Sequence, residues 1–393
     1  MNATTATRLT DALSLHATTG AAWLDSRRAD AARLFRDKGV PHRRVENWKY
    51  TDLKTALDGA DDAGANDIRC IIGTLPDGVE LFDLGDLADA PQWVQAHFGK
   101  AALSDSMPAA SLVLARAGFA LRVPKNLRAL QPLRIAVEGS GHARVLLVLE
   151  EGAALELVES RPEGTGFSNV GMEIVVGANA RMTHVRVADA SPEAIAVEDI
   201  AVRVARDGAY SVHLASGGAS LSRLNVRLTL KEPGAHAELS GVSVLGGRLH
   251  ADVTTEIYHA AGETRSVQLF KHVVGGHGRA VYQGKITVAE GADKSDSRQT
   301  AKALLMGERA EADLKPELEI FADDVKCAHG AAVGDLDADS LFYLRARGIS
   351  EGEARNMLVR AFLEESVSQI ADETVRAAVW QSVEATLPGA MAP

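Results

Sequence analysis

Cysteine is almost absent from this chain of 393 residues, which contains only Cys70 and Cys327. Two cysteines so far apart do not make the disulfide framework of a small secreted protein. They also exclude a metal site built from four cysteines of this chain alone. Aromatic residues make up only 5% of the sequence, whereas alanine and glycine are abundant. This composition suits a regular, tightly stacked architecture better than a large aromatic-lined pocket.

Positive charge is in the minority, and long apolar runs do not occur. Lys and Arg number 42 against 53 Asp and Glu, which gives a net charge of −11. Such a chain repels a phosphate backbone on average, so nucleic-acid binding is disfavoured. No apolar run is long enough to span a bilayer, and the Thr- and Ala-rich N-terminus lacks the apolar core of a signal peptide. We therefore expect a cytoplasmic protein without a membrane or nucleic-acid partner.

The N-terminal part of the sequence has mainly helical signals. Residues 21–38 contain few helix breakers and are followed by Gly39 and Pro41, a combination typical of a helix end. The segment that follows contains Trp48 and Tyr50, which we expect to pack this part of the protein rather than to bind a ligand.

From about residue 133 the pattern changes to short segments in which apolar and polar residues alternate, as in residues 154–158 and 180–187. A glycine precedes such segments every 25 to 31 residues. These glycines are Gly152, Gly177, Gly208, Gly234, Gly262 and Gly291. Strands within a longer repeat indicate a solenoid, because the turns of a sandwich would recur about every 8–12 residues. We predict a right-handed parallel β-helix of about six coils.

Helical signals return at the C-terminus. Asp337 can cap a short helix that stops at Gly348, and residues 350–353 read as a capping box, S-x-x-E. A third helix can start at Asp372, with its end expected at Pro388. The predicted fold is therefore mainly β. Its parts are a mostly helical N-terminal domain (1–130), a β-helix core (131–335) and a C-terminal helical domain (336–393).

The C-terminal helical domain has two possible roles. Terminal repeats of a solenoid need covering, so the domain can protect the open edge. Its first helix also gathers aromatic and arginine side chains, which are the residues enriched in interface cores. Phe342 and Tyr343 could therefore either dock this helix on the solenoid or contact a partner.

Cys327 and His329 form the most informative pair of residues. In a β-strand, residues i and i+2 point to the same face, about 7 Å apart. Thiolate and imidazole both bind transition metals, but two ligands do not complete a four-coordinate site. The other ligands would have to come from elsewhere. The alternative is a buried cysteine that acts as a small hydrophobe beside a hydrogen-bonded histidine.

Three other histidines follow the repeated glycines, namely His184, His213 and His236. They could form a metal-binding ladder or a row of side chains on the solenoid surface, and we favour the surface row. The sequence contains neither G-x-S-x-G nor H-E-x-x-H, and no phosphate-binding loop. It therefore lacks the motifs of hydrolases and of nucleotide hydrolysis.

Several segments resemble the SufB/SufD family of iron–sulfur cluster assembly scaffolds. These segments are residues 46–51, 281–286, 304–306, 315–337 and 341–349. The length and the cysteine count favour the D type, SufD, over the longer and cysteine-richer SufB. Ala328 and Ala332 stand where the family often has Ser and Thr, and neither difference removes a ligand.

The resemblance implies a non-catalytic scaffold subunit that pairs with SufB through the ends of two β-helices and binds the ATPase SufC through its C-terminal helices. No cofactor would stay bound to the isolated chain, and a transient Fe–S cluster or iron would be shared with SufB. The candidate ligands are His329, the better candidate, and Cys327. The SufB-interface strand would contain Val325, Lys326, Cys327 and His329. The SufC-docking candidates are Phe342, Tyr343, Arg345, Arg347, Met357 and Phe362.

Two other functions stay open from the sequence. A purely structural adaptor would recruit and regulate the ATPase without ligating iron. A β-helix enzyme acting on polysaccharide would need carboxylates or basic residues that converge on an exposed cleft, and usually secretion, so we disfavour it. An unpaired edge strand favours self-association, which would allow a homodimer when the partners are absent.

Overall fold

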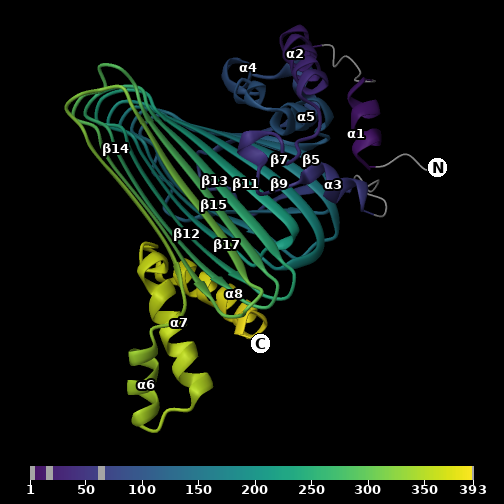
Figure 1. Ribbon diagram of the computed structural model, residues 1–393. Helices are drawn as coiled ribbons and strands as arrows, with labels where there is room; N and C mark the ends of the chain where they lie inside the picture. Colours follow the sequence, from purple (N-terminus) through teal and green to yellow (C-terminus); the bar gives the residue numbers. More distant parts are fainter. Residues whose placement is uncertain (1–4, 15–20, 61–66, 392–393) are drawn as a thin grey trace.

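The computed structural model describes residues 5–14, 21–60 and 67–391. Two nine-stranded sheets wind around a common interior (Figure 1). Sheet A contains β1 (Arg69–Ile72), β4 (Leu133–Glu138), β6 (Ala154–Arg161), β8 (Arg181–Ala188), β10 (Ala209–Ser216), β12 (His236–Leu245), β14 (Arg265–Val274), β16 (Asp296–Leu305) and β18 (Lys326–Gly334). Sheet B contains β2 (Glu80–Asp83), β3 (Ala117–Val123), β5 (Gly141–Leu149), β7 (Gly166–Val176), β9 (Ser191–Val204), β11 (Ala219–Leu230), β13 (His250–His259), β15 (Arg279–Val288) and β17 (Glu311–Ile320).

Successive strands from β3 to β18 alternate between the two sheets, and each pairs in parallel with the strand two positions away. Among the strands of the described residues, only β1 and β2 pair antiparallel, at the starting end of the solenoid. With eight parallel strands in each sheet, the described chain forms a parallel β-helix of eight turns. The predicted fold class is confirmed, and the first strand of the ladder, β3, lies within the range expected to be mostly helical.

The repeated glycines occupy one corner of the solenoid. Each of the six lies between a strand of sheet B and the next strand of sheet A. Gly152, Gly234 and Gly291 have φ of 70°, 76° and 75°, a conformation that other residues adopt at a cost. The prediction of about six coils was too low. The chain passes the same corner twice more, at residues 124–132 and 321–325, and neither segment contains a glycine.

Aliphatic side chains stack from turn to turn in the interior of the solenoid. One such row on sheet B is in register along five successive strands and is almost completely buried. It consists of Val123, Leu149, Val176, Val204 and Leu230. Full burial of each such side chain stabilises the fold by about 1.5–3 kcal/mol. The next residue of this row is the buried His259, and the row then continues with the buried Val288.

The N-terminal helices lie beside sheet B at the starting end of the solenoid (Figure 1). They are α1 (Thr5–Ser14), α2 (Ala22–Lys38), α3 (Leu53–Asp58), α4 (Gln92–His97) and α5 (Ser106–Leu114). Three 3-10 helices, Glu46–Trp48, Leu84–Asp89 and Ala101–Ser104, complete this region. Helix α2 ends at Gly39 as predicted. Trp48 is buried, and the Arg223 guanidinium lies 4.2 Å from its ring centroid, which confirms its packing role.

Three C-terminal helices follow β18, and they are α6 (Ala338–Ala346), α7 (Glu351–Val367) and α8 (Glu373–Met391). Helices α7 and α8 pack on the outer face of sheet A, whereas α6 extends away from the solenoid (Figure 1). The Asp337 cap and the Ser350–Glu353 capping box form as predicted. No helix within the described residues is both long and apolar enough to span a bilayer.

The end predicted for α8 at Pro388 is wrong. The helix continues through Pro388 to Met391, because its buried face continues on both sides of the proline. That face consists of Val375, Val379, Val383, Leu387 and Ala390. Gly246 and Gly275 allow the close approach, since a Cβ atom at Gly275 would lie 1.8 Å from the Ala390 carbonyl oxygen. Tertiary packing therefore offsets the hydrogen bond that proline removes.

Candidate functional site

Cys327 and His329 lie on β18, the last strand of sheet A. In the parallel ladder, Cys327 is in register with Ser297 and His329 with Gln299. Ser297 and Gln299 are buried and point into the solenoid, so Cys327 and His329 lie on the interior-facing side of the final turn. Cys327 is half-buried against the core, whereas His329 is exposed. The spacing thus places both candidate ligands on one face, at the open end of the solenoid.

The other two residues of the predicted interface strand are neighbours of this pair. Lys326 begins β18, and its amide donates to the Ser295 carbonyl at 2.9 Å. Val325 precedes the strand and packs against the core. Burial raises the pKa of the Cys327 thiol, although a hydrogen bond from the Ser297 backbone opposes this effect. A metal that binds this sulfur must therefore displace a proton.

The donor set at this end is incomplete. Across the described parts of the chain, no three His, Cys, Asp or Glu side chains come together as a group that could hold a metal. Cys70 cannot supply a further ligand to this pair, because it lies on β1, at the opposite end of sheet A. Eight strand spacings separate β1 from β18, which amounts to about 38 Å. Further ligands for Cys327 and His329 would have to come from another molecule.

The predicted docking residues on α6 are exposed. Phe342 is 74% and Tyr343 56% exposed, and no residue of α6 is buried. Of the two roles left open for these aromatics, docking of the helix on the solenoid does not fit their exposure. The Arg347 guanidinium lies 4.4 Å from the Tyr343 ring centroid, and Arg345 pairs with Glu351 at 3.3 Å. The helix thus presents a surface of aromatic and arginine side chains. The contacts that hold these side chains come from the helical domain itself.

The two docking candidates on α7 differ from each other. Met357 is 49% exposed, on the same helical hairpin as Phe342. Phe362 instead packs against the outer face of sheet A, where Lys271 Nζ lies 4.3 Å from its ring centroid. Met357 thus belongs to the exposed surface of the helical domain, while Phe362 holds that domain on the solenoid.

The expected surface row of histidines is wrong. His184 and His213 are buried, and their register shows that they face opposite sides of sheet A, because His184 pairs with Val212 and His213 with Val185. His213 Nδ1 bonds to Ser240 at 2.9 Å. The described residues of these strands form no metal-binding ladder either, since each buried histidine has its own polar partner.

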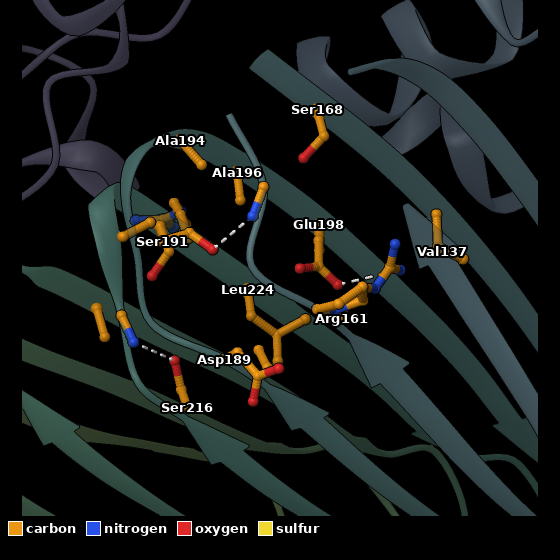
Figure 2. Close-up of a pocket in the computed structure, with 18 of the residues that line it drawn as sticks. Val137, Arg161, Ser168, Asp189, Ser191, Ala194, Ala196, Glu198, Ser216 and Leu224 are labelled. Atoms are coloured by element: carbon orange, nitrogen blue, oxygen red, sulfur yellow. Dashed lines mark hydrogen bonds and ion pairs between the residues drawn. The ribbon is translucent and has the colours of Figure 1, made fainter. Parts of the chain in front are cut away.

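The interior of the early turns contains a charged cluster that sequence reasoning missed. Arg161 pairs with Glu159 at 2.7 Å and with Glu198 at 3.2 Å, and His184 Nε2 bonds to Glu159 at 2.9 Å. Arg161 and Glu198 line a cavity of about 80 Å³, and Figure 2 shows these two side chains. Burial opposes ionisation, yet Arg161 and His184 hold the pKa of Glu159 below its usual range. Strand alternation could have revealed the cluster, since Leu155, Leu157, Glu159 and Arg161 share one face of β6.

Comparison with known proteins identifies the family. The family model for the SUF system FeS cluster assembly SufBD core domain matches residues 134–362, and the model for the SufBD protein N-terminal region matches residues 9–70. The chain therefore belongs to the SufBD family of the SUF iron–sulfur cluster assembly system. Within that family it is most like the SufD proteins.

Individual relatives cover nearly the whole chain. The iron–sulfur cluster assembly protein SufD of Escherichia coli is 32% identical over 382 residues, which cover 89% of this chain and 90% of that protein. An iron–sulfur cluster assembly SufBD family protein of Synechocystis is 29% identical, with 88% of this chain and 87% of that protein covered. The SufD protein of Bacillus subtilis is 25% identical, with 90% and 92% covered. The predicted family is confirmed.

Proposed function

We propose that this chain is a non-catalytic scaffold subunit of a cytoplasmic iron–sulfur cluster assembly complex. It pairs with a SufB-type subunit at the open end of the solenoid and binds a SufC-type ATPase through α6 and α7. One observation carries the proposal: Cys327 and His329 lie together on the terminal strand of the solenoid, with an incomplete set of donors. A site of this kind becomes complete only when another chain supplies the remaining ligands.

The open end suits pairing with another solenoid. Within the described residues, β17 and β18 each have a ladder partner on one side only, so each presents unpaired backbone groups to another chain. Ile320, Phe321 and Val333 are large apolar side chains exposed at this end. Apolar groups beside a free strand edge support a stable interface rather than a solvated end.

Cys327 and His329 supply donors that suit iron and iron–sulfur clusters. The cluster is cargo in this proposal, because it is built at the interface and then passed on. His329 is the better ligand candidate, since its imidazole is exposed at the open end. Cys327 is half-buried, and burial raises the pKa of its thiol, so it loses its proton less readily before metal arrives.

The helical hairpin of α6 and α7 supports the second contact. Its first helix, α6, extends away from the solenoid (Figure 1), and the hairpin exposes Phe342, Tyr343 and Met357. Aromatic, methionine and arginine side chains are enriched where proteins bind one another. An ATPase that binds this hairpin would lie outside the solenoid and away from the interior-facing ligands.

His329→Ala tests the ligand assignment. The variant is co-expressed with the SufB-type and SufC-type partners, and the complex is purified without oxygen. We expect lower iron and sulfide content per complex, with the partners still bound and the urea unfolding midpoint unchanged, because His329 is exposed. His277→Ala is the matched control, since His277 is an exposed histidine on the loop between β14 and β15. Equal cluster content in the two variants would exclude His329 as a ligand.

The second candidate function is a structural adaptor for the ATPase in which Cys327 and His329 are inert. The raised pKa of the Cys327 thiol is the observation that favours it. A variant that replaces both residues separates the two functions. The adaptor predicts that the complex forms and binds iron as in the wild type, whereas the scaffold predicts that it forms but binds less iron.

A further inference from the structure

The interior of the last turns of the solenoid is polar. These turns bury hydroxyl, amide and imidazole groups, whereas the interior of the early turns combines stacked aliphatic side chains with the charged cluster around Glu159. The buried polar side chains there are Thr255, His259, Ser266, Gln268, His272, Tyr282, Ser297 and Gln299. Burying polar groups costs stability unless each finds a hydrogen-bond partner. A polar interior next to the candidate site therefore needs an explanation.

Two rows of this polar interior end at the candidate ligands. Along sheet A, Ser266, Ser297 and Cys327 are in register. The deeper part of this row has its hydrogen bonds, since His259 Nε2 bonds to Ser266 at 2.9 Å and Ser266 to Ser297 at 2.6 Å. The two serines of this first row, Ser266 and Ser297, therefore already have hydrogen-bond partners within the solenoid.

The second row places Gln268, Gln299 and His329 in register on successive strands. The Gln268 amide oxygen accepts a hydrogen bond from the Tyr282 hydroxyl at 3.1 Å, while its amide nitrogen has no partner. Gln299 is only 1% exposed. Its amide lies near the Tyr282 hydroxyl, but neither its oxygen nor its nitrogen has a well-formed hydrogen bond in the described structure.

The fold makes room for this unsatisfied amide. A Cβ atom at Gly284 would lie 1.7 Å from Gln299 Nε2, so the glycine leaves space for the Gln299 side chain. Leaving a buried polar group unsatisfied destabilises the folded state, and such a group in a native structure calls for a specific reason. His329 is its neighbour on the next strand, about 4.8 Å away along the ladder.

We propose that Gln299 is a positioning residue for His329. Its amide oxygen accepts a hydrogen bond from one ring nitrogen of His329, which leaves the other ring nitrogen free to bind the metal. Histidine ligands commonly donate their second ring N–H to such an acceptor, which fixes the tautomer and the ring orientation. The inference rests on the proposed function, because it assumes that His329 is a ligand. It adds a residue on β16 that touches no metal and acts only through His329.

The test uses the complex of the full chain with its SufB-type partner, purified without metal, and Co(II) as the probe. Gln299→Met keeps the side-chain size and removes the acceptor, whereas Gln299→Glu keeps an acceptor oxygen. Gln268→Met is the matched control, because Gln268 lies in the same buried row, one turn deeper. We expect Gln299→Met to weaken Co(II) binding at least about tenfold and to shift its visible spectrum. Gln299→Glu and Gln268→Met should keep the wild-type affinity and spectrum.

The outcomes separate this inference from the proposed function. Equal Co(II) affinity in the wild type and in His329→Ala overturns the ligand assignment itself. If His329→Ala weakens binding and a folded Gln299→Met does not, only the role of Gln299 is wrong. Equal loss in Gln268→Met and Gln299→Met also overturns it, because general core packing then explains the effect. If Gln299→Met does not fold, Gly284→Ala displaces the same amide without removing it, and unchanged affinity there overturns the inference.

Discussion

Replacing Asp252 by alanine should destabilise the protein more than any change at an exposed ion pair. Asp252 and Arg223 are both almost completely buried where the N-terminal region meets sheet B. Asp252 Oδ2 accepts from Arg223 Nη1 at 2.7 Å and from the Thr51 hydroxyl at 2.5 Å. Its other oxygen accepts from the Thr254 hydroxyl at 3.0 Å. Asp252→Ala therefore leaves a buried guanidinium without its counter-charge.

The size of the expected loss in the free energy of unfolding depends on the burial of the ion pair rather than on its contact distance. Removing one partner of a buried ion pair costs about 3–5 kcal/mol, because the remaining charge has neither a partner nor water. Lys125 and Glu151 also pair at 2.7 Å, but their side chains are more than half exposed. Glu151→Ala should therefore cost less than about 1 kcal/mol. The two ion pairs have equal contact distances, but Asp252 is buried and accepts two further hydrogen bonds.

Urea unfolding followed by tryptophan fluorescence measures both changes. Trp48 reports directly, because the Arg223 guanidinium lies against its ring. Asp252→Ala should lower the unfolding midpoint without changing the slope. Adding Arg223→Met to Asp252→Ala should recover part of the loss, since the buried charge is then gone. Equal, small losses for Asp252→Ala and Glu151→Ala would refute the reasoning.

Three further predictions concern other parts of the molecule. Burial lowers the pKa of His142 and His272 from 6.5 to about 4, so the unfolded chain binds more protons between these values. The free energy of unfolding should therefore fall as the pH falls from 6.5 to 4, and a flat urea-unfolding profile over this range would contradict that. Gly275→Ala should displace the end of α8 and speed its hydrogen exchange. Gly352→Ala, which meets nothing within 4 Å, should not. Phe342→Ala should change the free energy of unfolding by less than about 0.5 kcal/mol but weaken capture of the SufC-type ATPase in a pull-down; unchanged capture would exclude this surface.

Much of the solenoid could be predicted from local chemistry. The repeated glycines mark one corner because several of its turns need a left-handed backbone, and strand alternation marks the inward positions. The number of turns was underestimated because residues 124–132 and 321–325 turn the same corner without glycine. The end of α8 was also missed, since packing on Gly246 and Gly275, far away in sequence, outweighs the local effect of Pro388.

The candidate site was only partly predictable. Spacing alone placed Cys327 and His329 on one face of a strand, and the structure shows that they are interior-facing at the open end. The role of Gln299 could not be proposed from the sequence, because its nearness to His329 depends on the register between β16 and β18. His184 was misplaced for a similar reason, since its partner Glu159 lies one turn away. Contacts across turns depend on the length of each coil, which varies along this chain.

The most direct test of the central claim is iron K-edge X-ray absorption on the cluster-loaded complex, with wild-type chain and with His329→Ala. If His329 ligates the nascent cluster, imidazole scattering present in the wild type will be missing from the iron that remains in the variant. Identical spectra and identical iron content in the two complexes would contradict the claim. The chain would then be an adaptor whose terminal strand pairs with its partner without contributing a ligand.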